Sequence, residues 1–201
     1  MREDEEPNRR IQILKTTRST HKKPSTVMSS TSTARDKAGC YQDTRRRIGA
    51  LLNEKTDWVA AMATVACELH HSFAHYDWTG FYRPVGERTL LVGPYQGPHG
   101  CLRVDFGQGV CGAAARTRET QVVPDVGEAS DYIACQSSTR SELVVPILTP
   151  EKELLAVLDV DSDTLGAFGT TDQEHLEALS ERLGERFGKK GWGAIGRSIH
   201  R

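Results

Sequence analysis

The chain has 201 residues, of which 26 are Lys or Arg and 27 are Asp or Glu, giving a formal net charge of -1 at pH 7. This balance excludes a strongly basic face, and with it nucleic-acid binding as the main function. The sequence has no apolar run of about 18 residues and no secretory signal pattern, so we expect a cytoplasmic protein with no membrane partner. The length predicts one domain of about 140 to 150 residues.

Residues 1–39 are polar and contain almost no large apolar residues. Because such a segment cannot bury enough apolar surface to fold, it is predicted to be a disordered extension. Its basic, hydroxyl-rich middle is typical of a transit peptide, but the acidic run at residues 3–6 argues against one. Met28 is an alternative start that would remove the extension. The folded domain is expected at residues 40–188, followed by a loose tail at 189–201.

Two helices are predicted before the first strand, one from about Tyr41 and one capped by Thr56 or Asp57. The second helix has an apolar stripe at three- and four-residue spacing, which predicts a face packed on the core. The stripe consists of Trp58, Met62, Val65, Leu69 and Phe73. Cys67 lies off this stripe, and we interpret it as a small buried hydrophobe rather than a catalytic thiol.

Strand patterns begin at residues 78–82, and a turn at 86–88 leads to a returning strand at 89–92. Side chains alternate along a strand, so Trp78, Gly80 and Tyr82 share one face. Two interpretations of this face stay open. It is either an aromatic part of the core or the wall of a pocket for a thioether or methyl group, since sulfur is attracted to aromatic edges.

Three cysteines, Cys101, Cys111 and Cys135, lie in the middle of the chain. A strand at residues 102–106 follows Cys101, and glycines then open a short helix at about 110–117. Cys111 falls in the first turn of that helix, where the helix dipole favours a thiolate. The free backbone N–H groups there can also bind an anion such as a substrate carboxylate.

Cys135 follows a strand at residues 121–124 and a polar loop, and small hydroxyl residues surround it. We predict that it is the nucleophile, because a loop cysteine is accessible and Arg140 can lower its pKa. An odd number of cysteines in a reducing compartment favours free or catalytic thiols over a disulfide framework. Their spacing lacks the close ligand pairs of structural zinc sites, so no metal is expected.

Two carboxylates interrupt the second strand of a hairpin predicted at residues 142–148 and 154–161. Asp159 and Asp161 lie on one face of this strand, about 6 to 7 Å apart. Asp is disfavoured in strands and seldom buried unpaired. The pair marks either a strand end running into solvent or a pocket floor, where desolvation and mutual repulsion raise the proton affinity of one carboxylate.

A terminal helix is predicted from the capping box at residues 171–174, with a stripe of Leu176, Leu179, Leu183 and Phe187. Helices at both ends of a mostly antiparallel central sheet predict a single domain of the α+β class. One face of the sheet would then be free for a ligand.

The ordered motifs resemble those of free methionine-R-sulfoxide reductases, which are GAF-domain enzymes, over about residues 41–188. The matching segments are Trp78-Thr79-Gly80-Phe81-Tyr82, Gly109-Val110-Cys111-Gly112, Val122-Val123-Pro124-Asp125-Val126, Ile133-Ala134-Cys135, Ser141-Glu142-Leu143-Val144-Val145-Pro146 and Leu158-Asp159-Val160-Asp161-Ser162. As an ordered set they are far more specific than any one of them.

The resemblance implies that Cys135 attacks the substrate, that Cys101 resolves the resulting intermediate and that Cys111 is an auxiliary thiol. Two residues depart from the family pattern: Tyr132 stands where His is expected, and Gln136 stands where Asp is expected. These departures concern the tuning of the nucleophile. The family's aromatic wall corresponds to Trp78 and Tyr82.

The family's substrate-binding carboxylates correspond to Glu142, Asp159 and Asp161. We predict that Glu142 is the general acid, because a carboxyl group with a raised pKa can protonate the sulfoxide oxygen. The implied reaction reduces free methionine-R-sulfoxide through a cysteine sulfenic acid and an intramolecular disulfide, which thioredoxin or a similar dithiol would reduce. No metal or organic cofactor is implied, and a homodimer through terminal helices is compatible with the family.

Two other functions stay open. One is a GAF module that binds a cyclic nucleotide or another small ligand without catalysis. The expectation that no output domain fits after Phe187 argues against such a sensor. The other is a redox-sensing module whose thiols oxidise without turnover.

Overall fold

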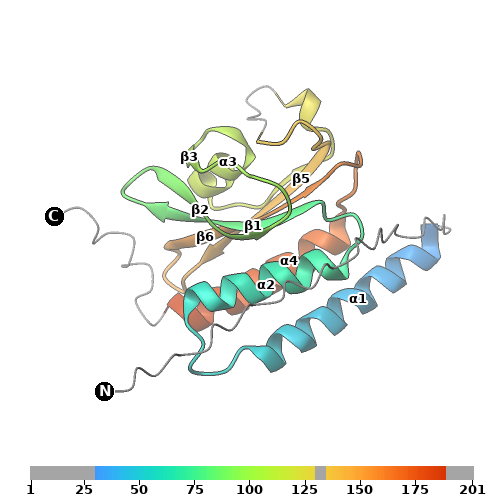
Figure 1. Ribbon diagram of the computed structural model, residues 1–201, viewed down its shortest axis with the longest axis horizontal. Helices are drawn as coiled ribbons and strands as arrows, with labels where there is room; N and C mark the ends of the chain where they lie inside the picture. The colour runs from blue at the N-terminus through green and yellow to red at the C-terminus, as the bar shows by residue number, and fades with distance from the viewer. Residues whose placement is uncertain (1–29, 130–134, 189–201) are drawn as a thin grey trace, which may run out of the picture.

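A six-stranded antiparallel sheet organises the protein in a computed structural model, which describes residues 30–129 and 135–188 (Figure 1). The strand order is β3-β2-β1-β6-β5-β4, and all five neighbouring pairs are antiparallel. The strands are β1 (Trp78–Val85), β2 (Thr89–Gln96), β3 (Arg103–Asp105), β4 (Gln121–Val123), β5 (Ser141–Leu148) and β6 (Leu154–Ser162). The predicted α+β class with an antiparallel sheet is confirmed.

Helices cover both faces of the sheet. On one face α2 (Trp58–Ser72) and α4 (Thr170–Gly188) pack against the strands, and α1 (Ser30–Leu51) lies outside them (Figure 1). On the other face the short helix α3 (Gly109–Thr117) packs over β5 and β6, and a single 3-10 turn, η1 (Val126–Glu128), follows β4. The sheet therefore separates a helical layer from a more open face.

Each face of the sheet has its own apolar core, because side chains alternate along the strands. The stripes predicted on α2 and α4 are buried in the core beneath the helical layer, together with Phe81 and Leu158. Asp57 caps α2, because its side chain accepts a hydrogen bond from the backbone N–H of Ala60. Trp78, Tyr82 and Cys111 belong to the core on the α3 side.

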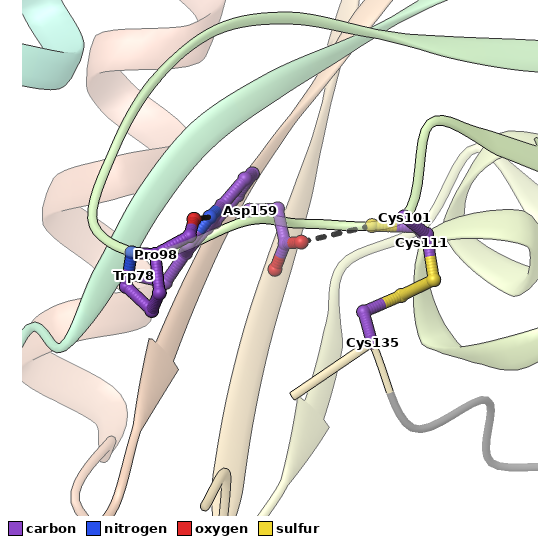
Figure 2. Close-up of a disulfide and its surroundings, with 6 residues drawn as sticks. All are labelled: Trp78, Pro98, Cys101, Cys111, Cys135 and Asp159. Carbon is purple, nitrogen blue, oxygen red and sulfur yellow. Dashed lines mark hydrogen bonds between the residues drawn. A yellow bond between two sulfur atoms is a disulfide. The ribbon is translucent and has the colours of Figure 1, made fainter. Parts of the chain in front are cut away.

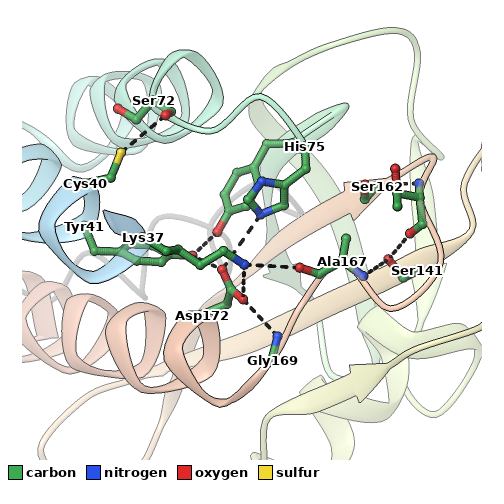
Figure 3. Close-up of polar contacts among 12 residues, drawn as sticks. Lys37, Cys40, Tyr41, Ser72, His75, Ser141, Ser162, Ala167, Gly169 and Asp172 are labelled. Atoms are coloured by element: carbon green, nitrogen blue, oxygen red, sulfur yellow. Dashed lines mark hydrogen bonds and ion pairs between the residues drawn. The ribbon is translucent and has the colours of Figure 1, made fainter. Parts of the chain in front are cut away.

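Helix α1 begins at Ser30, so the predicted helix start near Tyr41 is wrong, while the predicted domain bounds stay a prediction. Polar contacts hold this part of the helix, and apolar periodicity could not reveal them. The Lys37 ammonium lies 2.7 Å from Oδ2 of the buried Asp172, and the Tyr41 hydroxyl donates to Oδ1 of Asp172 (Figure 3). The rest of the predicted extension, residues 1–29, and the predicted tail at 189–201 lie outside the described residues.

The start of α4 also differs from the prediction. The helix begins at Thr170, and the Asp172 carboxylate accepts a hydrogen bond from the backbone N–H of Gly169 at 2.8 Å (Figure 3). The capping position is therefore Gly169, and the capping box predicted at residues 171–174 is wrong. One carboxylate thus caps α4 and binds α1.

Cys67 is exposed on the outer side of α2, so its interpretation as a buried hydrophobe is wrong. Its neighbours Ala66 and Leu69 point into the core, and the helical turn places residue 67 away from them. Among the helices that the structure describes, none is long and apolar enough to cross a membrane.

Candidate active site

Strand pairing gathers the candidate residues on the face of the sheet that α3 covers. In the antiparallel register, Asp161 of β6 lies between Trp78 of β1 and Glu142 of β5. Asp159 lies two residues before Asp161 in β6 and pairs with Gly80 and Val144. Because directly paired residues point to the same face, strands distant in the sequence bring an aromatic ring and three carboxylates together.

The carboxylates of Glu142, Asp159 and Asp161, here called the carboxylate cluster, are buried, with exposed fractions of 6%, 4% and 9%. The strand end therefore does not run into solvent at these residues. Burial raises the pKa of Asp159 to about 7. Burial, followed by repulsion from the neighbouring carboxylates, raises the pKa of Glu142 and of Asp161 well above the usual range. The cluster retains protons at neutral pH.

Cys111 is buried beside this cluster, and its thiol donates a hydrogen bond to Oδ2 of Asp159 at 3.2 Å (Figure 2). Burial raises the pKa of the thiol well above its usual range, and the charges of Asp159 and Glu142 raise it further. The prediction that the helix dipole favours a thiolate here is wrong. Desolvation and negative neighbours outweigh the dipole at the first turn of α3.

A disulfide joins Cys101 to Cys135, with the Cα atoms 5.0 Å apart. Cys101 lies in the loop between β2 and β3, and Cys135 lies in the loop that leads to β5. The bond is the pairing that the resemblance implied, and Figure 2 shows it beside Cys111 and Asp159. The roles of the two cysteines, and the effect of Arg140 on Cys135, stay predictions. Tyr132 lies outside the described residues.

The aromatic residues of β1 belong to the core on the α3 side and also line the cavity described below, while their contact with a thioether or methyl group stays a prediction. Trp78 and Tyr82 are each 2% exposed, and their ring centroids lie 5.9 Å apart. Gly80 leaves space for the Trp78 ring itself, because a Cβ atom there would overlap the indole and the side chain of Tyr95. The Trp78 indole N–H donates to the carbonyl of Pro98 at 3.0 Å, which fixes the loop before Cys101 (Figure 2).

These groups line a cavity of about 20 Å³ in this disulfide-bonded state. Its lining includes predicted residues from five segments, namely β1, α3, the loop before β5, β5 and β6: Trp78, Tyr82, Cys111, Cys135, Glu142, Asp159 and Asp161. The residues Gly109 and Val110 at the start of α3 also line it, as does Gln136. Four further residues line the cavity that were not predicted as site residues: Gly100, Val104, Gln108 and Thr139. Their residue types carry no signal in the sequence that marks them as part of a site.

Comparison with known proteins identifies the class of this fold and site. The family model for the GAF domain matches residues 57–187. The chain therefore belongs to the GAF-domain family.

Two relatives within that family carry names that state a specific enzymatic activity. A free methionine-R-sulfoxide reductase from Saccharomyces cerevisiae is 37% identical over 139 residues, covering 66% of this chain and 77% of that protein. The Escherichia coli protein of the same name is 33% identical over 148 residues, covering 74% of this chain and 88% of that protein. These relatives confirm the resemblance that the ordered motifs indicated.

A solved structure agrees with both. The free methionine-R-sulfoxide reductase from Neisseria meningitidis in complex with its substrate superposes with a TM-score of 0.72 at 41% identity. It covers 76% of this chain and 91% of that one.

Proposed function

We propose that this protein is a thiol-dependent reductase that converts free L-methionine-(R)-sulfoxide to L-methionine. One observation carries the proposal: Cys135, bonded to Cys101, lines the same cavity as an aromatic wall and three buried carboxylates. A sulfoxide needs a nucleophile at sulfur and an acid at oxygen, and this cavity offers both. The relatives named as reductases of this substrate support the assignment.

In the proposed substrate pose, the residues of the carboxylate cluster have different roles. Glu142 keeps a proton at neutral pH because burial and its acidic neighbours raise its pKa, so it can protonate the sulfoxide oxygen. Asp159 and Asp161 bind the substrate ammonium, whose positive charge lowers their pKa and favours the loss of their protons. Trp78 and Tyr82 face the thioether and its methyl group, and the N–H groups at the start of α3 receive the substrate carboxylate.

The proposed reaction moves one oxygen atom from the substrate to Cys135. Attack of the Cys135 thiolate on the sulfoxide forms a sulfur–sulfur bond, and the oxygen takes one proton from Glu142. The resulting hydroxyl group then moves to the Cys135 sulfur, as the sulfur–sulfur bond and the sulfur–oxygen bond of the substrate break and methionine leaves. The net change is thiol plus sulfoxide to sulfenic acid plus thioether. The Cys101 thiol then condenses with the sulfenic acid, releasing water and forming the Cys101–Cys135 disulfide.

A thioredoxin-like dithiol would complete the cycle by exchange, becoming a disulfide as the two cysteines return to thiols. No metal or organic cofactor takes part in this scheme. Such a reductant operates in a reducing compartment, consistent with the predicted cytoplasmic location. A homodimer through the terminal helices stays a prediction.

The direct test is turnover of the R and S diastereomers of free methionine sulfoxide with a dithiol reductant. We expect the wild-type protein to consume reductant with the R form and the Cys135→Ser variant to be inactive. The exposed Cys67→Ser variant serves as the matched control and should keep full activity. Turnover that survives Cys135→Ser would refute the assignment.

A second test concerns the acid. Glu142→Gln keeps the shape of the side chain but removes the carboxyl proton, so we expect kcat to fall by about 10² to 10⁴-fold, the usual range for general acid catalysis. Glu87→Gln, in the exposed turn between β1 and β2, is the control. A Glu142→Gln enzyme with the wild-type rate would exclude the acid role while leaving Cys135 as nucleophile.

A further inference from the structure

Three potential metal ligands converge beneath the cavity. The Cys111 sulfur, one Glu142 carboxylate oxygen and one Asp159 carboxylate oxygen all lie within 4.8 Å of one another, and all three residues are buried. The Cys111 sulfur lies 3.2 Å from Oδ2 of Asp159. The ligands come from α3, β5 and β6, one from each element, so their mutual distances depend on the tertiary structure.

A second observation concerns the charge of this group. When Glu142 is protonated, its carboxyl group hydrogen-bonds with Asp159. When Glu142 is ionised, Oδ1 of Asp159, a residue that is 4% exposed, is buried with no hydrogen-bond partner among the described residues. An unpartnered carboxylate oxygen in a buried site is unfavourable unless a proton or a cation compensates it. The oxygen belongs to a residue that lines the cavity, so a small ligand can reach it.

The geometry suits a tetrahedral ion. Zinc–sulfur bonds of about 2.3 Å and zinc–oxygen bonds of about 2.0 Å place sulfur and oxygen roughly 3.5 Å apart at a tetrahedral angle. The observed distance of 3.2 Å between the Cys111 sulfur and Oδ2 of Asp159 is close to this value. Ligand atoms that lie as much as 4.8 Å apart would have to move closer together, which side-chain rotation allows. The cavity of about 20 Å³ also has room for one water as a fourth ligand.

We propose that Cys111, Glu142 and Asp159 form a binding site for a borderline-soft divalent cation, Zn²⁺ or Cd²⁺, which replaces the protons of the Cys111 thiol and the Glu142 carboxyl group. A thiolate ligand selects such ions, whereas Mg²⁺ and Ca²⁺ prefer oxygen ligands alone. The bound ion would occupy two of the carboxylates assigned above to the substrate. Zn²⁺ is thus expected to inhibit the proposed reductase competitively with the sulfoxide.

The test uses the full chain with the Cys101–Cys135 disulfide intact, so that neither of these cysteines can bind metal. Titration with Cd²⁺ should produce the ultraviolet charge-transfer band of a cadmium thiolate, at about one ion per chain. Cys111→Ser should abolish the band, and the control Cys67→Ser should retain it. Asp159→Asn should weaken Cd²⁺ binding at least tenfold while the circular dichroism of the fold is retained.

Three results would overturn the site: no band in the wild-type protein, a band of equal strength in Cys111→Ser, or unchanged affinity in Asp159→Asn. The measurement needs no turnover, so its outcome is independent of the proposed reductase function. Only the inhibition rests on that function. A protein that binds Cd²⁺ at Cys111 but never reduces the sulfoxide would refute the activity and keep the site.

Discussion

At Asp159, the fold and the proposed chemistry make opposite demands on one carboxyl group. The fold buries the side chain, which favours the neutral form, while a role in binding an ammonium or a metal ion requires the charged form. A pKa of about 7 places Asp159 between these states at physiological pH. A small change in its surroundings, such as the arrival of a cation, is therefore sufficient to ionise it.

The raised pKa of Asp159 has a consequence for stability. In the unfolded chain the group titrates near pH 4, so the native state binds the proton more tightly. The stability linked to this group is complete below about pH 4 and is lost as the pH rises through about 7. When the pH is raised from about 4 to about 8, the unfolding free energy of Asp159→Asn should therefore increase by more than about 1.4 kcal/mol relative to that of the wild type.

Urea unfolding of the disulfide-bonded protein at both pH values measures this difference. Asp163→Asn is the control, because Asp163 is exposed just beyond the same strand. A constant difference between wild type and Asp159→Asn across this range would show that the carboxyl group titrates normally in the folded protein.

Among the elements, α4 packs closely against β5, the strand that carries Glu142. Helix α4 lies so near to β5 that a Cβ atom on Gly184 would overlap the carbonyl group of Leu148. The opposing group is backbone and cannot rotate away. Glycine at this position sets the distance between the helix and the strand.

Gly184→Ala should lower the free energy of unfolding by about 3 kcal/mol, because the strand or the helix must shift. The matched control is Gly49→Ala in α1, where an added Cβ meets no atom within 4 Å. Alanine is the better helix former, so this change should stabilise the protein by about 0.5 to 1 kcal/mol. Thermal melting of the two variants measures both effects, and equal melting temperatures would contradict the close packing of α4 on β5.

On the scale of the whole molecule, the sheet separates the layer that stabilises the fold from the face that holds the chemistry. The disulfide lies on the α3 side of the sheet, where Cys101 packs against the core that contains Cys111 (Figure 2). Leu102, directly after Cys101, is 76% exposed, an unusual state for a large apolar side chain. A protein that reduces the Cys101–Cys135 disulfide must approach this residue.

Leu102→Ser should therefore raise the KM for a protein dithiol about tenfold, because burying a leucine contributes about 1.5 to 3 kcal/mol and 1.4 kcal/mol corresponds to tenfold. Turnover with a small dithiol should not change, since it needs no apolar contact. Leu51→Ser, on α1 across the sheet and 54% exposed, is the control. Equal KM values for the protein dithiol in both variants would exclude Leu102 from the contact surface.

The sequence by itself determined the elements and the residue types of the candidate site. Apolar periodicity located α2, α4 and the strands, and misplaced carboxylates marked Asp159 and Asp161, because a charged residue within a strand conflicts with local preference. The ordered motifs indicated the GAF-domain family. These signals are local, because each one depends on residues that lie close together in the sequence.

Only the tertiary structure decided the electrostatics and the long-range polar contacts. The sequence placed Cys111 at a helix start that favours a thiolate, but the fold buries it against Asp159, and burial is a property of the whole chain. In the same way, the early start of α1 depends on Lys37 reaching Asp172, which lies on the last helix. Charge and burial sum over all neighbours in space, so no local pattern of residues contains them.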